Sequence, residues 1–248
     1  MESKKIEAKY NQSKNPRIGL IALATDFVIE RDFINVIKDK KIDFFVNRIT
    51  CYNPLTSENL IKMSQKITEV TKDILPDEKI DCVVYGCTSG TIAAGFNSIE
   101  KKIKLAKPEA KVTTPSSAAI KALKKLNIKK ISIFTPYSKK LNDEVVEYFK
   151  KEKFEITSNF YFDIDSDSNI WKVDQDYLYD ILSKIDLKNA DALFVSCTAL
   201  PVLPIIEKLE KKLNKIVLSS NQTLIWDALE KIGENKFIEG FGSLFNKN

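Results

Sequence analysis

The sequence contains no histidine. Histidine is the commonest general base near neutral pH and the commonest metal ligand in proteins. Any acid–base chemistry in this chain must therefore use cysteine, aspartate, glutamate, lysine or tyrosine. The cysteines also lack the C-x-x-C spacing of zinc sites. We therefore expect no bound metal.

Long apolar segments are absent as well. No apolar run approaches the ~20 residues that a membrane-spanning helix needs. The first residues, MESKKIEAKYNQSKNP, lack the apolar core of a secretory signal. Four cysteines in such a chain indicate free thiols in a reducing compartment rather than a disulfide framework. We expect a cytoplasmic protein with no membrane partner.

Arginine is scarce although the net charge is positive. Only three arginines accompany a formal net charge of +5, and the lysines are spread along the chain. Proteins that bind nucleic acids more often cluster their basic residues on one element, with arginine or aromatic side chains to read bases. We interpret the lysines as solvated helix faces and expect no nucleic-acid partner.

Short apolar runs alternate with helical patterns along the whole chain. Segments such as SENLIKMSQKITEVTKDIL repeat apolar residues every three and four positions, as amphipathic helices do. The alternation predicts an α/β fold with mostly parallel sheet and helices on both faces. Parallel strands end at one edge of a sheet, where ligands bind. Strands are predicted at residues 17–24, 42–50, 80–87, 110–115, 129–136, 154–162, 191–197 and 214–220.

One local pattern occurs twice. DCVVYGCTSGT and DALFVSCTALP both place Cys-Thr directly after an apolar strand, so that Cys87 and Cys197 lie 110 positions apart. The strand openings RIGLIALAT and KISIFTPYS repeat at a similar offset. A pseudo-two-fold relation between two such halves would place the two cysteines face to face across a cleft.

We therefore predict two similar α/β lobes. The first comprises residues 1–112, and the second comprises residues 113–220. We expect the helix after Ser220, within residues 221–248, to pack back on the first lobe. The cleft between the lobes is the predicted active site.

The two strand-end cysteines suit acid–base chemistry. A cysteine just before a helix lies near the free amides of that helix, which stabilise the thiolate and lower the thiol pKa. Thr88 and Ser89 add donors suited to a carboxylate. A thiolate and a thiol on opposite faces of a small acid form an acid–base pair. The alternative for any cysteine is a small buried apolar residue, and we assign that packing role to Cys51 and Cys82.

GCTSGT and SCTALP, with TTPSSAAIKAL and TPY between them, resemble the Asp/Glu racemase superfamily. Within it the sequence is most similar to the branch of maleate cis–trans isomerase, arylmalonate decarboxylase and ectoine-utilisation protein A. The resemblance extends from LATDFVIERDF to SSNQTLIWDALEKIG, nearly the whole chain. It implies two flavodoxin-like lobes, an active site between them, and no metal or organic cofactor.

The resemblance also implies roles for both cysteines. In maleate isomerases the first-lobe cysteine adds to the substrate double bond and the second-lobe cysteine handles a proton; Cys87 and Cys197 match these positions. In the amino-acid racemases the same pair works on Cα. The decarboxylase lacks the first cysteine, so the presence of both argues against simple decarboxylation.

Further residues match substrate-contacting positions of the family. Tyr137 matches a tyrosine of the isomerase branch, although it could simply cap the strand edge. Thr88 and Ser89 match the carboxylate-binding turn, and we add Thr198, which follows the second cysteine. Thr114, like the neighbouring Ser116, is a weaker candidate, because serine or threonine before a helix is ordinary capping.

Two departures from the family pattern concern charge. Maleate isomerases carry asparagine where Asp26 and Asp167 stand here. A carboxylate repels a dicarboxylate but attracts a cationic group, so these residues suggest a substrate with a positive charge as well as a carboxylate. The racemases' Glu or His after the second Cys-Thr is replaced by Ala199 and Leu200, which argues against a plain aspartate or glutamate racemase.

The sequence therefore predicts a cofactor-independent isomerase or racemase. Its substrate would be a small carboxylic acid such as an amino acid, a dicarboxylate or an ectoine derivative. Alternatives are a cysteine-dependent lyase, similar to the algal dimethylsulfoniopropionate lyases, or a decarboxylase. A non-catalytic protein that binds a small ligand is a further alternative. We also expect a homo-oligomer.

Overall fold

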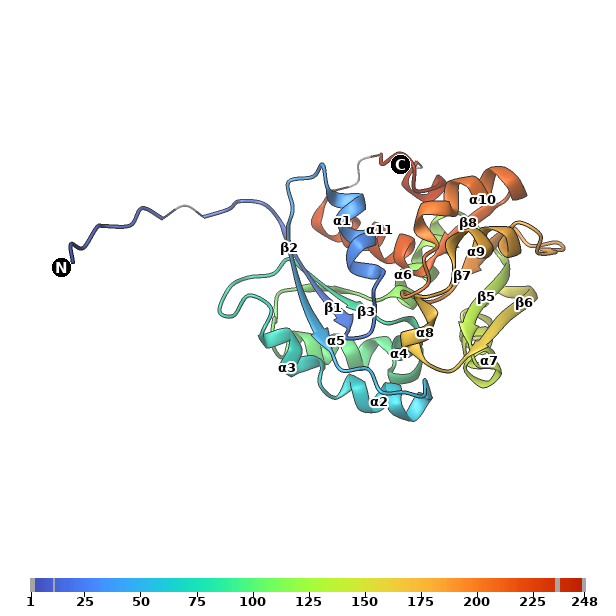
Figure 1. The fold of residues 1–248 in the computed structure, drawn as a ribbon, viewed down its shortest axis with the longest axis horizontal. Helices are drawn as coiled ribbons and strands as arrows, with labels where there is room; N and C mark the ends of the chain where they lie inside the picture. The colour runs from blue at the N-terminus through green and yellow to red at the C-terminus, as the bar shows by residue number, and fades with distance from the viewer. Residues whose placement is uncertain (1–2, 11, 235–236, 247–248) are drawn as a thin grey trace.

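The computed structural model describes residues 3–10, 12–234 and 237–246. In this part of the chain the strands form two four-stranded sheets, ordered β2-β1-β3-β4 and β6-β5-β7-β8, with all neighbouring strands parallel. Figure 1 shows the sheets side by side, the first from the N-terminal half and the second from the C-terminal half. The 2-1-3-4 order is that of flavodoxin-like sheets. The predicted fold class is confirmed.

Every strand predicted from the sequence is present. The central strands β1, β3, β5 and β7 are buried almost throughout, as continuous apolar runs in parallel sheets are. The edge strands β2 and β6 are only partly buried. The bounds are β1 Arg17–Leu23, β2 Asp43–Ile49, β3 Cys82–Gly86, β4 Lys111–Thr113, β5 Lys130–Tyr137, β6 Glu155–Ile164, β7 Ala192–Val195 and β8 Ile216–Ser219.

The helices follow the predicted alternation, with one difference. SENLIKMSQKITEVTKDIL forms two helices rather than one, with a break at Gln65 and Lys66. The bounds are α1 Ile29–Ile37, α2 Ser57–Ser64, α3 Ile67–Lys72, α4 Thr88–Ala94, α5 Phe96–Lys104, α6 Pro115–Lys125, α7 Lys139–Lys151, α8 Asp167–Ile170, α9 Gln175–Leu182, α10 Ile206–Leu213 and α11 Ser220–Ile232, with 3-10 turns at Leu203–Ile205 and Ser243–Phe245.

Helix α11 joins the two sheets. It begins directly after β8 of the second sheet and contacts α6, β3, α1 and β4. Asp227 of α11 accepts hydrogen bonds from Thr113 of β4 and Lys121 of α6. The exact lobe boundaries stay a prediction, and residues 1–2, 11, 235–236 and 247–248 of the predicted first lobe lie outside the described residues.

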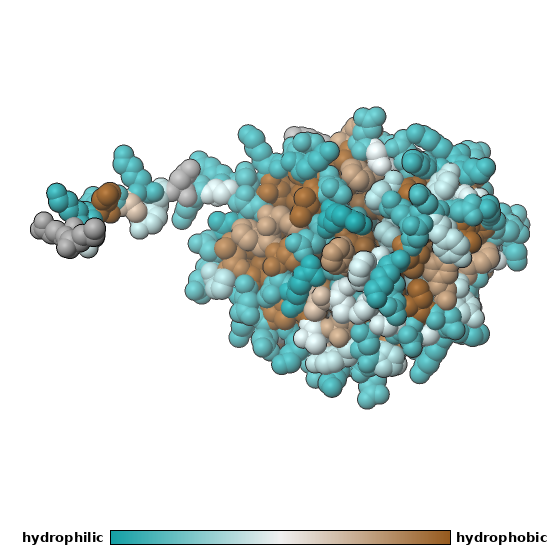
Figure 2. Space-filling view, in the orientation of Figure 1, coloured by the Kyte–Doolittle hydropathy of each residue, from teal (hydrophilic) through white to brown (hydrophobic). Residues whose placement is uncertain are grey.

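The surface matches the composition. Figure 2 shows hydrophilic residues around the whole outline of this face, with apolar residues showing in its interior. Lysines form exposed ion pairs on several helices, among them Lys139 with Asp143 and Lys211 with Glu207. Within the described residues, none of the helices is long and apolar enough to cross a membrane.

Candidate active site

The first cysteine turn is the start of a helix. Cys87 follows β3 and is the N-cap of α4, with extended backbone angles. Its sulfur accepts a hydrogen bond from the Gly90 amide at 3.2 Å and lies 3.9 Å from the Ser89 hydroxyl. A Cβ on Gly90 would lie 2.8 Å from the Cys87 sulfur, so glycine is what allows this close approach. The sequence predicted this arrangement.

The second cysteine turn has a different backbone. Cys197 follows β7 with a φ of 104°, a left-handed conformation that is rare for a residue with a side chain. No helix begins there: residues 198–200 form a turn, and the next helical turn starts at Leu203. The expectation that Cys197 would precede a helix is therefore wrong. Pro201 supplies the reason, because a proline disfavours the helical conformation at the residue before it.

Ser220, the first residue of α11, joins the two turns. Its hydroxyl oxygen accepts a hydrogen bond from the Thr88 hydroxyl at 2.8 Å and one from the Cys197 amide at 3.0 Å. A second link is the Thr198 hydroxyl, which donates to the Gly86 carbonyl at 3.3 Å. The Thr88 side chain and the Cys197 amide are therefore bonded to the same buried hydroxyl, which connects the two turns. From the sequence, Ser220 is predicted only as the end of a strand, whereas in the structure it begins α11.

A buried tyrosine lies beside each cysteine. Tyr137, at the end of β5, is 1% exposed, and burial together with the neighbouring Cys197 and Cys87 thiols raises its pKa. Tyr85 of β3 was not predicted as a site residue. A Cβ on Gly90 would lie 2.8 Å from both the Tyr85 hydroxyl and the Cys87 sulfur, so the two groups flank the same point. Its position two residues before Cys87, on the same face of the strand, was the available signal.

Asp26 and Asp167 approach each other from the two halves of the chain. The Thr25 hydroxyl donates to Asp167 at 2.5 Å, and Phe27 stacks on Trp171 with ring centroids 4.8 Å apart. These contacts flank Asp26 on both sides. Burial raises the pKa of both carboxyls, that of Asp167 to about 6.

A third buried carboxyl supports the second turn from behind. The Asn221 amide donates to Asp32 of α1 and to the Thr198 carbonyl, at 2.8 Å each. Burial raises the pKa of Asp32 to about 7. This network was not predicted, because Asp32 lies inside an amphipathic helix pattern that gives no sign of a buried acid.

Burial raises the pKa of both thiols above the usual range. For Cys87 this effect outweighs the Gly90 amide, and for Cys197 it outweighs the Tyr137 hydroxyl and the Ala199 amide. The negative charge of Asp167 raises both thiol pKa values further. The prediction of a lowered thiol pKa is therefore wrong, because the net shift is upward. The Gly90 amide by itself lowers the pKa of Cys87, as predicted.

The remaining candidates differ in their surroundings. The Thr114 hydroxyl lies 2.9 Å from that of Ser117 in the capping box of α6, as the capping alternative predicted. Cys82 is fully buried in the core, as expected. Cys51 is only partly buried, and burial together with Asp167 raises its pKa to about 12. It therefore lies beside the site rather than serving only in packing.

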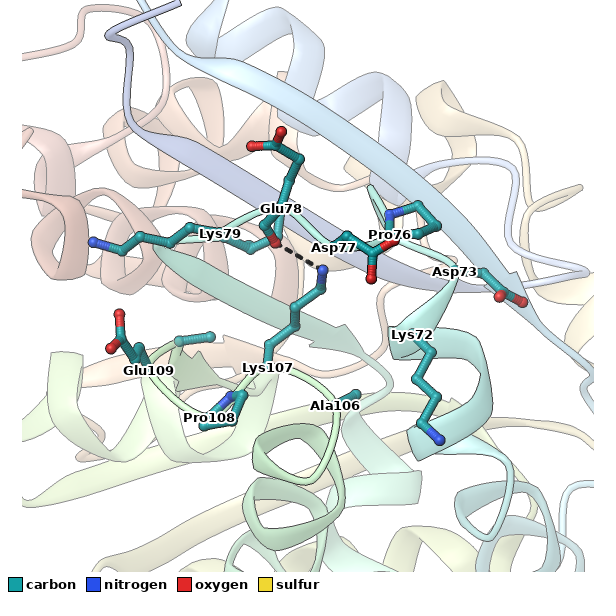
Figure 3. Close-up of a pocket in the computed structure, with 12 residues that line it drawn as sticks. Lys72, Asp73, Pro76, Asp77, Glu78, Lys79, Ala106, Lys107, Pro108 and Glu109 are labelled. Atoms are coloured by element: carbon teal, nitrogen blue, oxygen red, sulfur yellow. Dashed lines mark hydrogen bonds between the residues drawn. The ribbon is translucent and has the colours of Figure 1, made fainter.

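A surface groove elsewhere offers no comparable chemistry. Its walls are the segments before β3 and before β4, at the amino ends of these strands, whereas Cys87 follows the carboxyl end of β3 (Figure 3). The Lys107 ammonium in this groove donates to the Leu75 and Glu78 carbonyls at 2.8 Å each. The Lys107 ammonium is therefore already engaged by the segment before β3.

The fold has two sheets of parallel strands, and a cysteine follows the end of one strand in each sheet. These features define a class of two-lobed proteins with paired cysteines at one buried site. The chain belongs to the arylmalonate decarboxylase family, whose model matches residues 55–245. The family resemblance expected from the sequence is confirmed.

Similar proteins include several maleate isomerases. That of Geobacillus stearothermophilus is 26% identical over 249 residues, covering 94% of this chain and 98% of that protein. The crystal structure of the Pseudomonas putida S16 maleate isomerase matches with a TM-score of 0.86 and 21% identity, over 94% of this chain and 98% of that one. A Nocardia farcinica maleate cis–trans isomerase mutant with a covalently bound succinylcysteine intermediate also matches with a TM-score of 0.86, at 19% identity over 94% and 99% of the two chains. The structural matches establish the fold.

Proposed function

We propose that this protein is a cofactor-independent isomerase or racemase that acts on a small carboxylic acid through Cys87 and Cys197. The observation that carries the proposal is the meeting of two strand-end cysteine turns, from separate sheets, at the Ser220 hydroxyl. Similar proteins support it, because they include maleate isomerases, and a mutant of one maleate cis–trans isomerase has a covalently bound succinylcysteine intermediate.

The two thiols can divide the chemistry in either of two ways. On an alkene acid, the Cys87 sulfur adds to one alkene carbon and the electron pair passes to the next carbon, which takes a proton from Cys197. Rotation about the new single bond and reversal of both steps gives the isomer. On an α-substituted acid, one thiolate removes the Cα proton and the opposite thiol returns one.

We propose that the residues around the cysteines bind the substrate. Ser89 and the free amides of α4 would hold a carboxylate, since anions favour helix N-termini. The Tyr137 and Thr198 hydroxyls would contact the reacting part of the substrate. The Thr88 hydroxyl donates its one proton to Ser220, so we assign it to holding the turn, and a carboxylate contact by Thr88 stays a prediction. A substrate contact by Thr114 stays a prediction.

The test is turnover of maleate and of α-amino acids, followed by fumarate absorbance and by chiral chromatography. We expect Cys87→Ser and Cys197→Ser each to lose about 10³-fold in turnover, the range for removing an acid–base group, with unchanged thermal unfolding. Cys82→Ala is the matched control, because Cys82 lies in the core. Normal turnover by both serine variants would contradict the two-cysteine mechanism.

One observation favours a second candidate. Asp26 and Asp167 suit a cationic leaving group, so β-elimination of a sulfonium from a carboxylic acid is the runner-up. Incubation with dimethylsulfoniopropionate and measurement of volatile sulfide separates the lyase from the isomerase. Release of carbon dioxide from an arylmalonate tests the decarboxylase alternative. A homo-oligomer and a cytoplasmic location stay predictions, the former checked by light scattering.

A further inference from the structure

Two buried carboxyls from different halves of the chain lie beside the cysteine pair. Asp26 follows β1 and is 1% exposed, and Asp167 begins α8 and is 2% exposed. The Thr25–Asp167 hydrogen bond and the Phe27–Trp171 stack hold the two segments together on either side of Asp26. Phe27 is 66% exposed, so this aromatic pair reaches the outer surface.

The two carboxyls are incompletely paired. Asp26 Oδ1 accepts from the Val28 and Ile29 amides, but Asp26 Oδ2 is buried without a hydrogen-bond partner among the described residues, since the nearby Thr198 hydroxyl donates to the Gly86 carbonyl instead. Within the described residues 3–10, 12–234 and 237–246, no lysine or arginine forms an ion pair with the carboxylate of Asp26 or of Asp167. Buried charges are normally paired, because an unpaired one costs several kcal/mol.

Candidates for the missing cation within the protein are engaged elsewhere. The Arg48 guanidinium donates to the Leu23 and Asp26 carbonyls and pairs with Glu30. A metal ion is not favoured either, because the described residues contain no group of three or more cysteine, aspartate or glutamate side chains that could hold one. The Arg48 charge lowers the pKa of Asp26, but within the described part of the chain no cation pairs directly with the Asp26 carboxylate.

We propose that the substrate is a small carboxylic acid that also carries a cationic group, an ammonium or a similar onium centre, held by Asp26 and Asp167. This inference rests on the proposed function, because it assigns the ligand of the same site. The carboxylate of the substrate would lie toward Ser89 and the α4 amides, and the cation toward the two aspartates. The site would thus select zwitterions over dicarboxylates.

The position of the two carboxylates also affects the ionisation of the two thiols. Asp167 raises the pKa of both thiols, and Asp26 raises that of Cys197. A cation bound between the carboxylates offsets their field, so the thiols ionise more readily once the correct substrate is bound. A dicarboxylate would bring a further negative charge to the same place. Charge selectivity would therefore act on turnover as well as on binding.

A rival account keeps both carboxyls protonated, so that they act as neutral hydrogen-bond donors to a dicarboxylate. Burial, which raises the pKa of both groups, favours the protonated form. The two accounts differ in what asparagine does. Asparagine replaces a neutral acid well and removes the attraction for a cation completely.

The experiment is isothermal titration at pH 8 of the Cys87→Ser/Cys197→Ser protein, which binds without turning over. The probes are matched in length: succinate against β-alanine, and glutarate against 4-aminobutyrate. We expect each ammonium acid to bind at least about tenfold more tightly than its dicarboxylate partner, a modest share of the attraction between opposite charges in a partly buried site. Adding Asp26→Asn/Asp167→Asn should abolish or reverse the preference.

The control is Asp176→Asn/Asp180→Asn, which removes the same charge from two exposed positions of α9 and should leave the preference unchanged. Circular dichroism verifies that each variant is folded. The proposal is overturned if the dicarboxylates bind as tightly as the ammonium acids, if no ammonium acid binds at millimolar concentration, or if the site asparagines leave the ratio unchanged. Failure of the proposed function would appear separately, as normal turnover in the single cysteine variants.

Discussion

The two cysteine turns share a sequence pattern but not a structure. Cys87 has extended backbone angles, caps α4 and accepts the Gly90 amide, whereas Cys197 has a φ of 104° and no helix directly behind it. The residues after Cys-Thr decide the difference. Ser-Gly allows a helix to begin close to the sulfur, and Ala-Leu-Pro prevents one.

The difference teaches how two similar lobes can assign different roles to equivalent residues. The first sulfur accepts a hydrogen bond from the Gly90 amide of its own helix, which partly offsets the effect of burial and suits it to the role of nucleophile or base. The second turn is held by a group from another segment, the Ser220 hydroxyl at the Cys197 amide, and the Tyr137 hydroxyl lowers the pKa of its thiol. A left-handed residue costs about 1–3 kcal/mol and persists only where its surroundings impose it. The second turn therefore depends on its neighbours more than the first does.

The largest expected effect concerns pH and the support of the second turn. The pKa of Asp32 is raised to about 7, so the neutral acid is favoured in the folded state. Its stabilising contribution is complete below pH 3.8 and is lost as pH rises through 7. Asp32→Asn, which mimics the neutral acid, should match the wild type near pH 4 and exceed its unfolding free energy at pH 8 by up to about 4 kcal/mol.

Urea denaturation at several pH values measures this difference. Asp191→Asn is a control of opposite sign, because hydrogen bonds from the Lys130 and Lys129 amides lower the pKa of Asp191. Its stabilising contribution is present above the usual pKa of aspartate and is lost in acid. A pH-independent difference between wild type and Asp32→Asn would show that folding does not raise the pKa of Asp32.

The next effect concerns the group that joins the turns. Ser220→Ala leaves the Thr88 hydroxyl and the Cys197 amide without their acceptor, which should cost about 1–3 kcal/mol of stability. Turnover should fall beyond what this destabilisation explains, with kcat more affected than KM. Ser132→Ala is the matched control, because Ser132 is buried and its hydroxyl bonds to that of Ser158. Equal turnover by Ser220→Ala and Ser132→Ala would show that Ser220 has only a structural role.

The smallest effect compares the two backbones directly. At Cys197, with positive φ, glycine should be more stable than alanine by about 1 kcal/mol. At Cys87, where φ is −147°, the entropy cost of glycine and its preference over alanine at an N-cap nearly cancel, so the two variants should be about equally stable. Guanidinium denaturation of the four variants gives both differences. A glycine advantage of the same size at both positions would contradict the difference between the two backbones.

The sequence was sufficient for the strands and for the position of both cysteines just after β3 and β7, because apolar runs and a repeated motif are local signals. It was insufficient for the break within SENLIKMSQKITEVTKDIL, where the helical pattern continues but the structure has two helices. It also missed Tyr85, Asp32 and Ser220 as parts of the site. Asp32 and Ser220 act through contacts between distant segments, and such contacts leave no periodicity in the chain. Tyr85 lies two residues before Cys87, so its signal was local and was overlooked.

The central claim is that Cys87 and Cys197 share one small site. Intact-mass spectrometry of the Cys51→Ser/Cys82→Ala variant after iodoacetamide treatment tests it without a known substrate, because only Cys87 and Cys197 then remain to react. We predict that alkylation stops at one adduct per chain, found by peptide mapping at either Cys87 or Cys197, since the first adduct fills the space beside the other thiol. Chains that carry adducts on both cysteines, formed at independent rates, would contradict the account.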